Sequence, residues 1–135
     1  MGDGGSDATP AAATPAAPPH RRTRAATWRC PNPSEFSLLV VSQHLDIVVQ
    51  LCGELDLASI PSLEECLGAA AAEAPRRLVL DLSALMFIDA AGVAALVRAR
   101  RRADAEAVGM VLDSPIAPVR RVLAITDLDR EFVIR

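Results

Sequence analysis

Residues 80–92 read LDLSALMFIDAAG and join an expected strand to an expected helix. They begin inside a short, nearly continuous apolar run at 77–82, which is typical of a central strand buried on both faces. A loop containing Phe87 and Ile88 is expected next. Asp89 then begins a long helix, because its carboxylate can accept hydrogen bonds from the unpaired N–H groups of the first helical turn. A buried strand followed by a helix indicates an α/β domain.

The residues before this segment predict two strands and one helix. Two runs rich in β-branched residues, at 36–42 and 45–52, are separated by only two residues and predict a hairpin. Pro61 fits the first turn of a helix, where a missing N–H costs nothing. Apolar residues at helical spacing carry that helix to about residue 73, and Pro75 stops it.

The residues after the segment continue the alternation. A buried strand is expected at 110–112, a third helix at 115–124 and a last strand at 131–134. The order β-β-α-β-α-β-α-β predicts one α/β domain, with a mixed sheet of about four or five strands and helices packed against it. Because aromatic residues make up only 3% of the chain, its core is expected to be aliphatic.

The first 34 residues differ in composition from the rest. They hold six of the ten prolines and show no apolar periodicity, so we expect a disordered tail before a domain at 35–135. The amino terminus starts with acidic residues and has no apolar core behind a basic cluster, so no signal peptide is predicted. No apolar run approaches the roughly 20 residues of a membrane helix. A cytoplasmic location is therefore expected.

Composition and motifs argue against several functional classes. A net charge of −3 disfavours general nucleic-acid binding, which depends on basic patches. The sequence has no glycine-rich phosphate loop, no His/Cys cluster with metal-ligand spacing and no nucleophile–base pair, so we predict no catalytic residue, no metal, no cofactor and no enzyme. Asp81 and Asp89 imitate paired carboxylates, but their spacing also fits a strand end and a helix cap.

The three cysteines, Cys30, Cys52 and Cys66, form no CxxC pair. An odd number of cysteines without a secretory signal predicts reduced thiols in a cytoplasm. Cys52 and Cys66 are interpreted as small buried hydrophobic residues. A redox role is the alternative.

Three motifs together resemble the STAS domain of bacterial anti-sigma factor antagonists. They are the GELD sequence at 53–56, the LDLS and FIDAAG sequences within 80–92, and the stretch from Ser114 to Leu128. They occur in the family's order and spacing and span about residues 36–135. The resemblance implies a STAS-type α/β fold. It also implies a transcription regulator that binds an anti-sigma factor of the serine kinase type and frees a sigma factor.

The resemblance also implies a partner-binding site around the start of the helix at Asp89. Its expected residues are Asp56, Ser83, Asp89, Ala90, Ala91, Gly92 and Val93. In related antagonists the residue directly after the aspartate is a serine that the partner phosphorylates, and the added charge disrupts the contact. Here Ala90 and Ala91 cannot accept a phosphate, so the usual off state is absent. Ser83 is a weak alternative phosphoacceptor and is better explained as a loop residue.

STAS domains also resemble one another in sensor and transporter assemblies. The second functional class is therefore a cytoplasmic STAS subunit or a ligand-sensing module of such a complex. Co-purification with a membrane complex, or with a tightly held small ligand, would distinguish this class from the antagonists.

Overall fold

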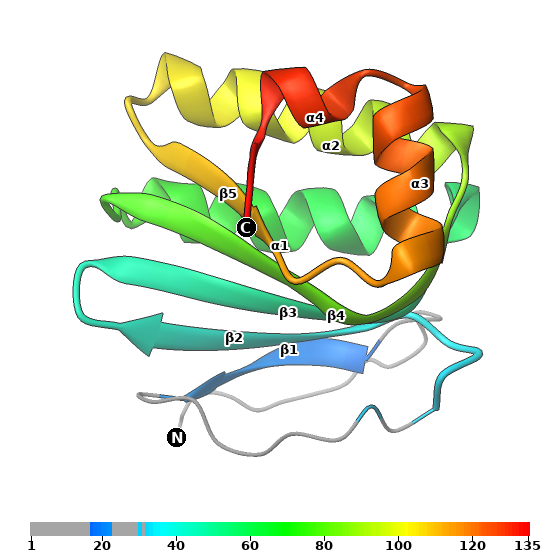
Figure 1. The fold of residues 1–135 in the computed structure, drawn as a ribbon. Helices are drawn as coiled ribbons and strands as arrows, with labels where there is room; N and C mark the ends of the chain where they lie inside the picture. The colour runs from blue at the N-terminus through cyan, green and yellow to red at the C-terminus, as the bar shows by residue number, and fades with distance from the viewer. Residues whose placement is uncertain (1–16, 23–29, 31) are drawn as a thin grey trace.

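The computed structural model describes residues 17–22, 30 and 32–135, which include a six-stranded sheet with helices on one face (Figure 1). The strands follow the chain in the order β1-β2-β3-β4-β5-β6 across the sheet. Their bounds are β1 Ala17–Arg22, β2 Ser37–Gln43, β3 Asp46–Leu55, β4 Arg77–Ile88, β5 Gly109–Asp113 and β6 Val133–Ile134. The strands β2–β6 form a five-stranded mixed sheet, as the sequence predicted.

Helices connect the parallel strands from β3 to β6. Strands β2 and β3 form an antiparallel hairpin, whereas the other neighbouring pairs are parallel. From β3 onward, each parallel pair is joined by a crossover connection. The crossover elements are η1 Leu57–Ser59, α1 Ile60–Ala72, α2 Ala90–Ala105, α3 Ala117–Ile125 and α4 Leu128–Glu131. Among the described residues, every helix is too short or too polar to cross a membrane.

The core between the sheet and the helices is aliphatic, as predicted. Alternate residues of β4, including Leu78, Leu80 and Leu82, point into it and are almost fully buried. Leu63 of α1 and Leu96 of α2 pack from the helix side. The twelve largest fully buried side chains are all leucine. Their burial supplies the main driving force for folding.

Two boundaries differ from the prediction. The strand expected at 77–82 continues to Ile88, so Phe87 and Ile88 lie in β4 rather than in a loop. The strand expected at 131–134 is shorter, because α4 ends at Glu131 and β6 contains only Val133 and Ile134. The longer β4 follows from tertiary pairing, since its last residues pair with β3, a contact that local sequence patterns do not show.

Part of the predicted tail is ordered. Residues 17–22 form β1, which pairs in parallel with β2, and residues 32–35 form a turn in which Glu35 N donates to Asn32 O at 3.0 Å. Residues 17–22 and 32–34, which the prediction placed in the disordered tail, therefore form a strand and part of a turn. Apart from Cys30, the rest of the predicted tail lies outside the described residues.

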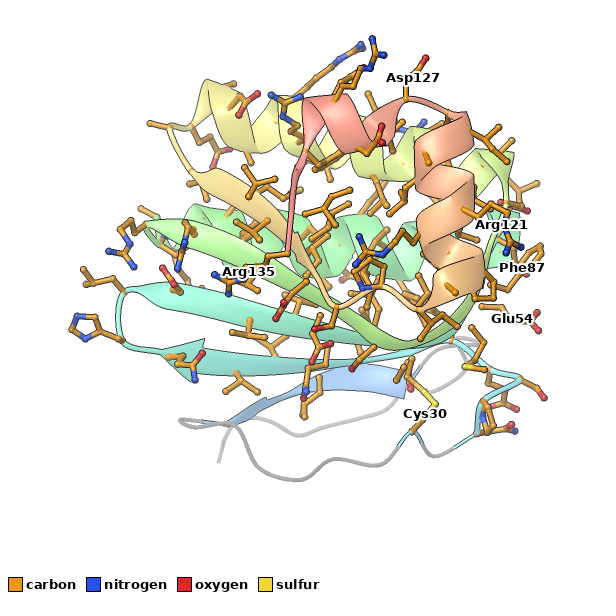
Figure 2. All side chains as sticks on the ribbon, in the orientation of Figure 1. Cys30, Glu54, Phe87, Arg121, Asp127 and Arg135 are labelled. Carbon is orange, nitrogen blue, oxygen red and sulfur yellow. A yellow bond between two sulfur atoms is a disulfide. The ribbon has the colours of Figure 1, made fainter. Side chains whose placement is uncertain are left out.

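Two of the cysteines are paired, which corrects the prediction of reduced thiols. Cys30 and Cys52 form a disulfide with a Cα–Cα distance of 5.6 Å (Figure 2). Cys52 and Cys66 are buried, as predicted, and Cys66, which lies in α1, is not part of this disulfide. The pairing could not be inferred from cysteine spacing, because 22 residues separate the partners along the chain and the fold brings them together.

An ion pair joins the starting ends of β3 and β4. Asp46 lies opposite Arg77 in the parallel pairing, and Arg77 Nη2 is 2.7 Å from Asp46 Oδ2. The hydrogen bond from Arg77 holds the pKa of the Asp46 carboxyl below its usual value. This end of the two strands lies opposite to the end that leads into η1 and α2.

Candidate partner-binding surface

The start of α2 is fixed against the end of β3. The Asp89 amide donates to the carbonyl of Leu55 at 3.2 Å, and the Asp89 carboxylate caps α2 by accepting from Gly92 N at 2.9 Å. A Cβ on Gly92 would lie only 2.6 Å from the Leu55 carbonyl oxygen. Glycine at this position therefore permits the close approach of helix and strand.

A second aspartate caps the neighbouring helix. Asp56 accepts hydrogen bonds from the amides of Ala58 and Ser59 at 3.1 and 3.2 Å, at the start of η1. The Ser59 hydroxyl also donates to this carboxylate at 3.0 Å. The capping role expected for Asp89 is confirmed, Asp56 has the same role, and both residues are half-buried rather than enclosed.

Exposed apolar side chains surround the two caps. Leu57, Met86 and Phe87 are 74%, 52% and 47% exposed, and Ala90 is exposed at the first position of α2. Met86 is the extra residue of a β-bulge, since Gly53 and Glu54 pair with Leu85 and Phe87. We call Leu57, Met86, Phe87 and Ala90, together with the carboxylates of Asp56 and Asp89, the contact surface.

Acidic residues border the contact surface. Glu54 lies opposite Phe87 in the strand pairing, and the two side chains are close at the same end of the molecule in Figure 2. A shallow pocket adjoins them, lined by Ser34, Glu35, Phe36, Glu54, Asp56, Ala58 and Ser59. One of its walls comes from the turn before β2 and the other from the end of β3 and η1. The described residues contain no group of three or more potential metal ligands.

The structure brings together only part of the predicted site. Ala90 is exposed and Ala91 half-buried beside Asp89, in agreement with a site at the start of α2. Val93 is only 8% exposed and belongs to the core, so its side chain cannot present itself to a partner. Gly92 is also buried and acts through its backbone.

Ser83 lies apart from the other predicted residues. It is exposed in the middle of β4, six positions before Asp89, which corresponds to about 20 Å along an extended strand. Its amide donates to the Asp81 carboxylate at 2.9 Å. It is therefore a strand residue rather than the expected loop residue, and it is not adjacent to the contact surface.

The sequence interpretation missed the three large apolar residues of the contact surface. Met86 and Phe87 were assigned to a loop, and the bulge that exposes them depends on pairing with β3. The exposure of Leu57 could have been predicted. A residue directly after a capping aspartate lies in the first helical turn, and Leu57 precedes the apolar periodicity that marks the buried face of the helix.

Replacing Asp89 should weaken the domain measurably. We expect Asp89→Ala to lower the free energy of unfolding by about 1 kcal/mol, because the Gly92 amide loses its side-chain acceptor. Urea denaturation followed by circular dichroism measures this change. Asp89→Asn is the matched control and should retain most of the stability, since asparagine is an equally good cap. Equal stability of Asp89→Ala and wild type would contradict a capping role.

Comparison with known proteins agrees with this fold. The family model described as "STAS domain" matches residues 38–135. The anti-sigma-F factor antagonist RsfB of Mycobacterium tuberculosis is 29% identical over 104 residues, which are 74% of this chain and 81% of RsfB. Among solved structures, an anti-sigma factor antagonist from Mycobacterium paratuberculosis superimposes with a TM-score of 0.66 at 32% identity, over 76% of this chain and 87% of that one. The antagonist SpoIIAA in its unphosphorylated form gives a TM-score of 0.61 at 25% identity, over 74% and 87%.

The chain belongs to the STAS domain family, and within it to the anti-sigma factor antagonists. The predicted fold class is thereby confirmed. The relatives are named as antagonists of other proteins, which also agrees with the prediction that the chain is not an enzyme.

Proposed function

We propose that this chain is a cytoplasmic antagonist that binds an anti-sigma factor of the serine kinase type and so frees a sigma factor for transcription. We further propose that phosphorylation at residue 90 does not switch it. The single observation that carries the proposal is the contact surface, where exposed apolar side chains surround the amino-terminal end of α2.

The physical character of this surface suits a protein partner. Leu57 and Phe87 are large apolar side chains that gain stability when a partner removes them from water. The carboxylates of Glu54, Asp56 and Asp89 around them favour a partner that brings arginine or lysine side chains. Apolar centre and charged rim together are the usual anatomy of a specific interface.

Residue 90 supports the absence of the phosphorylation switch. Ala90 is exposed on the contact surface directly after the capping Asp89, at the position where related antagonists carry a serine. A phosphate here would place about two negative charges beside an already acidic rim and disfavour docking. A methyl group at this position removes phosphorylation as a means of weakening the contact.

Direct binding measurements test the proposed partner class. The purified full chain is titrated by calorimetry with the anti-sigma-F factor of Mycobacterium tuberculosis and with the kinase-type anti-sigma factors of its own organism. We expect saturable binding to at least one of its own anti-sigma factors. Binding to none of them, with a transporter or a tightly held small ligand recovered with the chain, would instead favour the other class of STAS proteins.

A phosphorylation assay tests the role of Ala90. With the anti-sigma factor that binds and radiolabelled ATP, we expect the Ala90→Ser chain to be labelled and the wild type to remain unlabelled, because an alanine side chain has no hydroxyl to accept a phosphoryl group. Ala94→Ser, on an exposed position one turn further along α2, is the control for non-specific labelling. Label on the wild type would show that another hydroxyl carries a switch, and Ser83→Ala would then test the exposed serine of β4.

A further inference from the structure

The Cys30–Cys52 disulfide lies next to the contact surface along the chain. Cys52 directly precedes the GELD sequence whose aspartate, Asp56, caps η1. Its side chain is fully buried, whereas Cys30 is only half-buried. The bond therefore joins the segment before β2 to the strand that ends at the contact surface.

The turn that follows Cys30 packs on β3 immediately after Cys52. Ser34 N donates to the Asn32 side chain at 3.0 Å, which orders the turn. Gly53 has a φ of +98° and approaches the backbone of Glu35 so closely that a Cβ would overlap the Glu35 carbonyl oxygen. The disulfide fixes one end of this turn and buried Phe36 fixes the other.

The same turn forms a wall of the acidic pocket beside the contact surface. Glu35 and Phe36 face Glu54 and Asp56 across that pocket. From there a continuous series of backbone contacts reaches α2, since Leu55 accepts from the Asp89 amide at 3.2 Å. These contacts form a route along which order in the turn can act on both helix caps.

We propose that the Cys30–Cys52 disulfide is a reversible thiol switch that controls the contact surface, in place of the phosphorylation that Ala90 prevents. The disulfide form holds the pocket wall and the caps in order and binds the anti-sigma factor more tightly. The dithiol form frees the turn at its Cys30 end and binds more weakly, because ordering the turn then opposes binding. This regulatory role rests on the proposed function.

The exposure of the two sulfurs determines how the bond is reduced. A thiolate of a dithiol reductant attacks Sγ of half-buried Cys30, which forms a mixed disulfide and releases the thiolate of buried Cys52. The second thiol of the reductant then displaces Cys30. Two electrons pass to the protein, which ends with two thiols, and the reductant ends as a disulfide.

Oxidation by a peroxide restores the bond. The Cys30 thiolate takes one peroxide oxygen to become a sulfenic acid and releases water or an alcohol. The Cys52 thiol then attacks that sulfur, the disulfide forms, and a water molecule leaves. Disulfides in cytosolic proteins are usually of this transient or sensing kind. Peroxide is therefore the expected stimulus.

Hydrogen exchange tests the switch without a partner. The full chain is measured after peroxide treatment and after dithiothreitol, with mass spectrometric thiol counting in each state. On reduction we expect exchange at the amides of Ala58, Ser59 and Gly92 to accelerate about tenfold or more, since their local opening becomes easier. Exchange in α1 around Leu67 should not change.

Binding measurements complete the test. Reduction should weaken the affinity for the anti-sigma factor by roughly three- to tenfold. Cys30→Ser should behave as the reduced wild type in either reagent, whereas Cys66→Ala should keep the full response.

Equal exchange and equal affinity in both states would overturn the switch and leave the proposed function intact. If neither the oxidised nor the reduced chain bound an anti-sigma factor, the proposed function would be overturned, and the exchange data would still decide whether the switch exists. Two free thiols at Cys30 and Cys52 after peroxide treatment would overturn the switch.

Discussion

Gly53→Ala should lower the free energy of unfolding by about 3 kcal/mol or more, because two costs combine at this position. The φ of Gly53 is +98°, in a region that side chains with a Cβ rarely adopt. The new methyl group would also overlap the Glu35 carbonyl oxygen and contact Phe36 Cα at 3.1 Å. Both obstacles are backbone atoms, which cannot rotate away. Urea denaturation of the oxidised full chain measures the loss.

Gly68→Ala is the matched control for this substitution. Gly68 lies inside α1, and a Cβ there would meet only the end of the flexible Arg102 side chain at 3.1 Å. We expect equal or slightly greater stability, by up to about 1 kcal/mol, because alanine is the better helix former. If Gly53→Ala lowered the free energy of unfolding by less than Gly68→Ala raised it, the packing of the turn on β3 would be refuted.

Leu57→Asp should reduce the affinity for the anti-sigma factor by about 100-fold or more. Leu57 is 74% exposed on the contact surface, so a partner that covers it gains apolar burial that the variant cannot offer. The new carboxylate also adds to the negative charge of Asp56 and Glu54 and imitates the repulsion that a phosphate would cause. Calorimetric titration with the binding anti-sigma factor measures the loss.

The stability of Leu57→Asp should remain close to that of the wild type, because the first turn of a helix tolerates an acidic residue. Leu45→Asp is the control for the change in charge and hydrophobicity. Leu45 is 55% exposed and lies in the β2–β3 turn, at the opposite end of β3 from Leu57. Leu45→Asp should bind the anti-sigma factor like the wild type. An equal loss of affinity in Leu57→Asp and Leu45→Asp would argue against a localised contact surface.

Local sequence patterns predicted most of the fold, whereas the candidate site was implied by the resemblance to the antagonists and stays a prediction. Some sequence features act over only a few residues, so their structural consequences could be inferred from the sequence. They are the apolar run from Arg77, the capping position of Asp89 and the proline at 61. The fold confirms the α/β class and the caps, and it places Ala90 on an exposed helix start.

The predictions that were wrong depended on contacts between distant residues. The extension of β4 to Ile88 and the bulge at Met86 require pairing with β3. Pairing of Cys30 with Cys52 requires the turn at 32–35 to pack on Gly53. None of these contacts leaves a periodic trace in the sequence.

The position of β1 determines which strand lies at this edge of the sheet. With β1 in place, β2 is an interior strand, and the two-residue β6 is too short to recruit another sheet. Shortening the chain to begin at residue 36 would leave β2 as an open edge, with the apolar run Leu38 to Val41 next to unpaired backbone groups. Such an edge is a template for intermolecular strand addition. We therefore expect a chain that lacks β1 to aggregate more readily than the full chain.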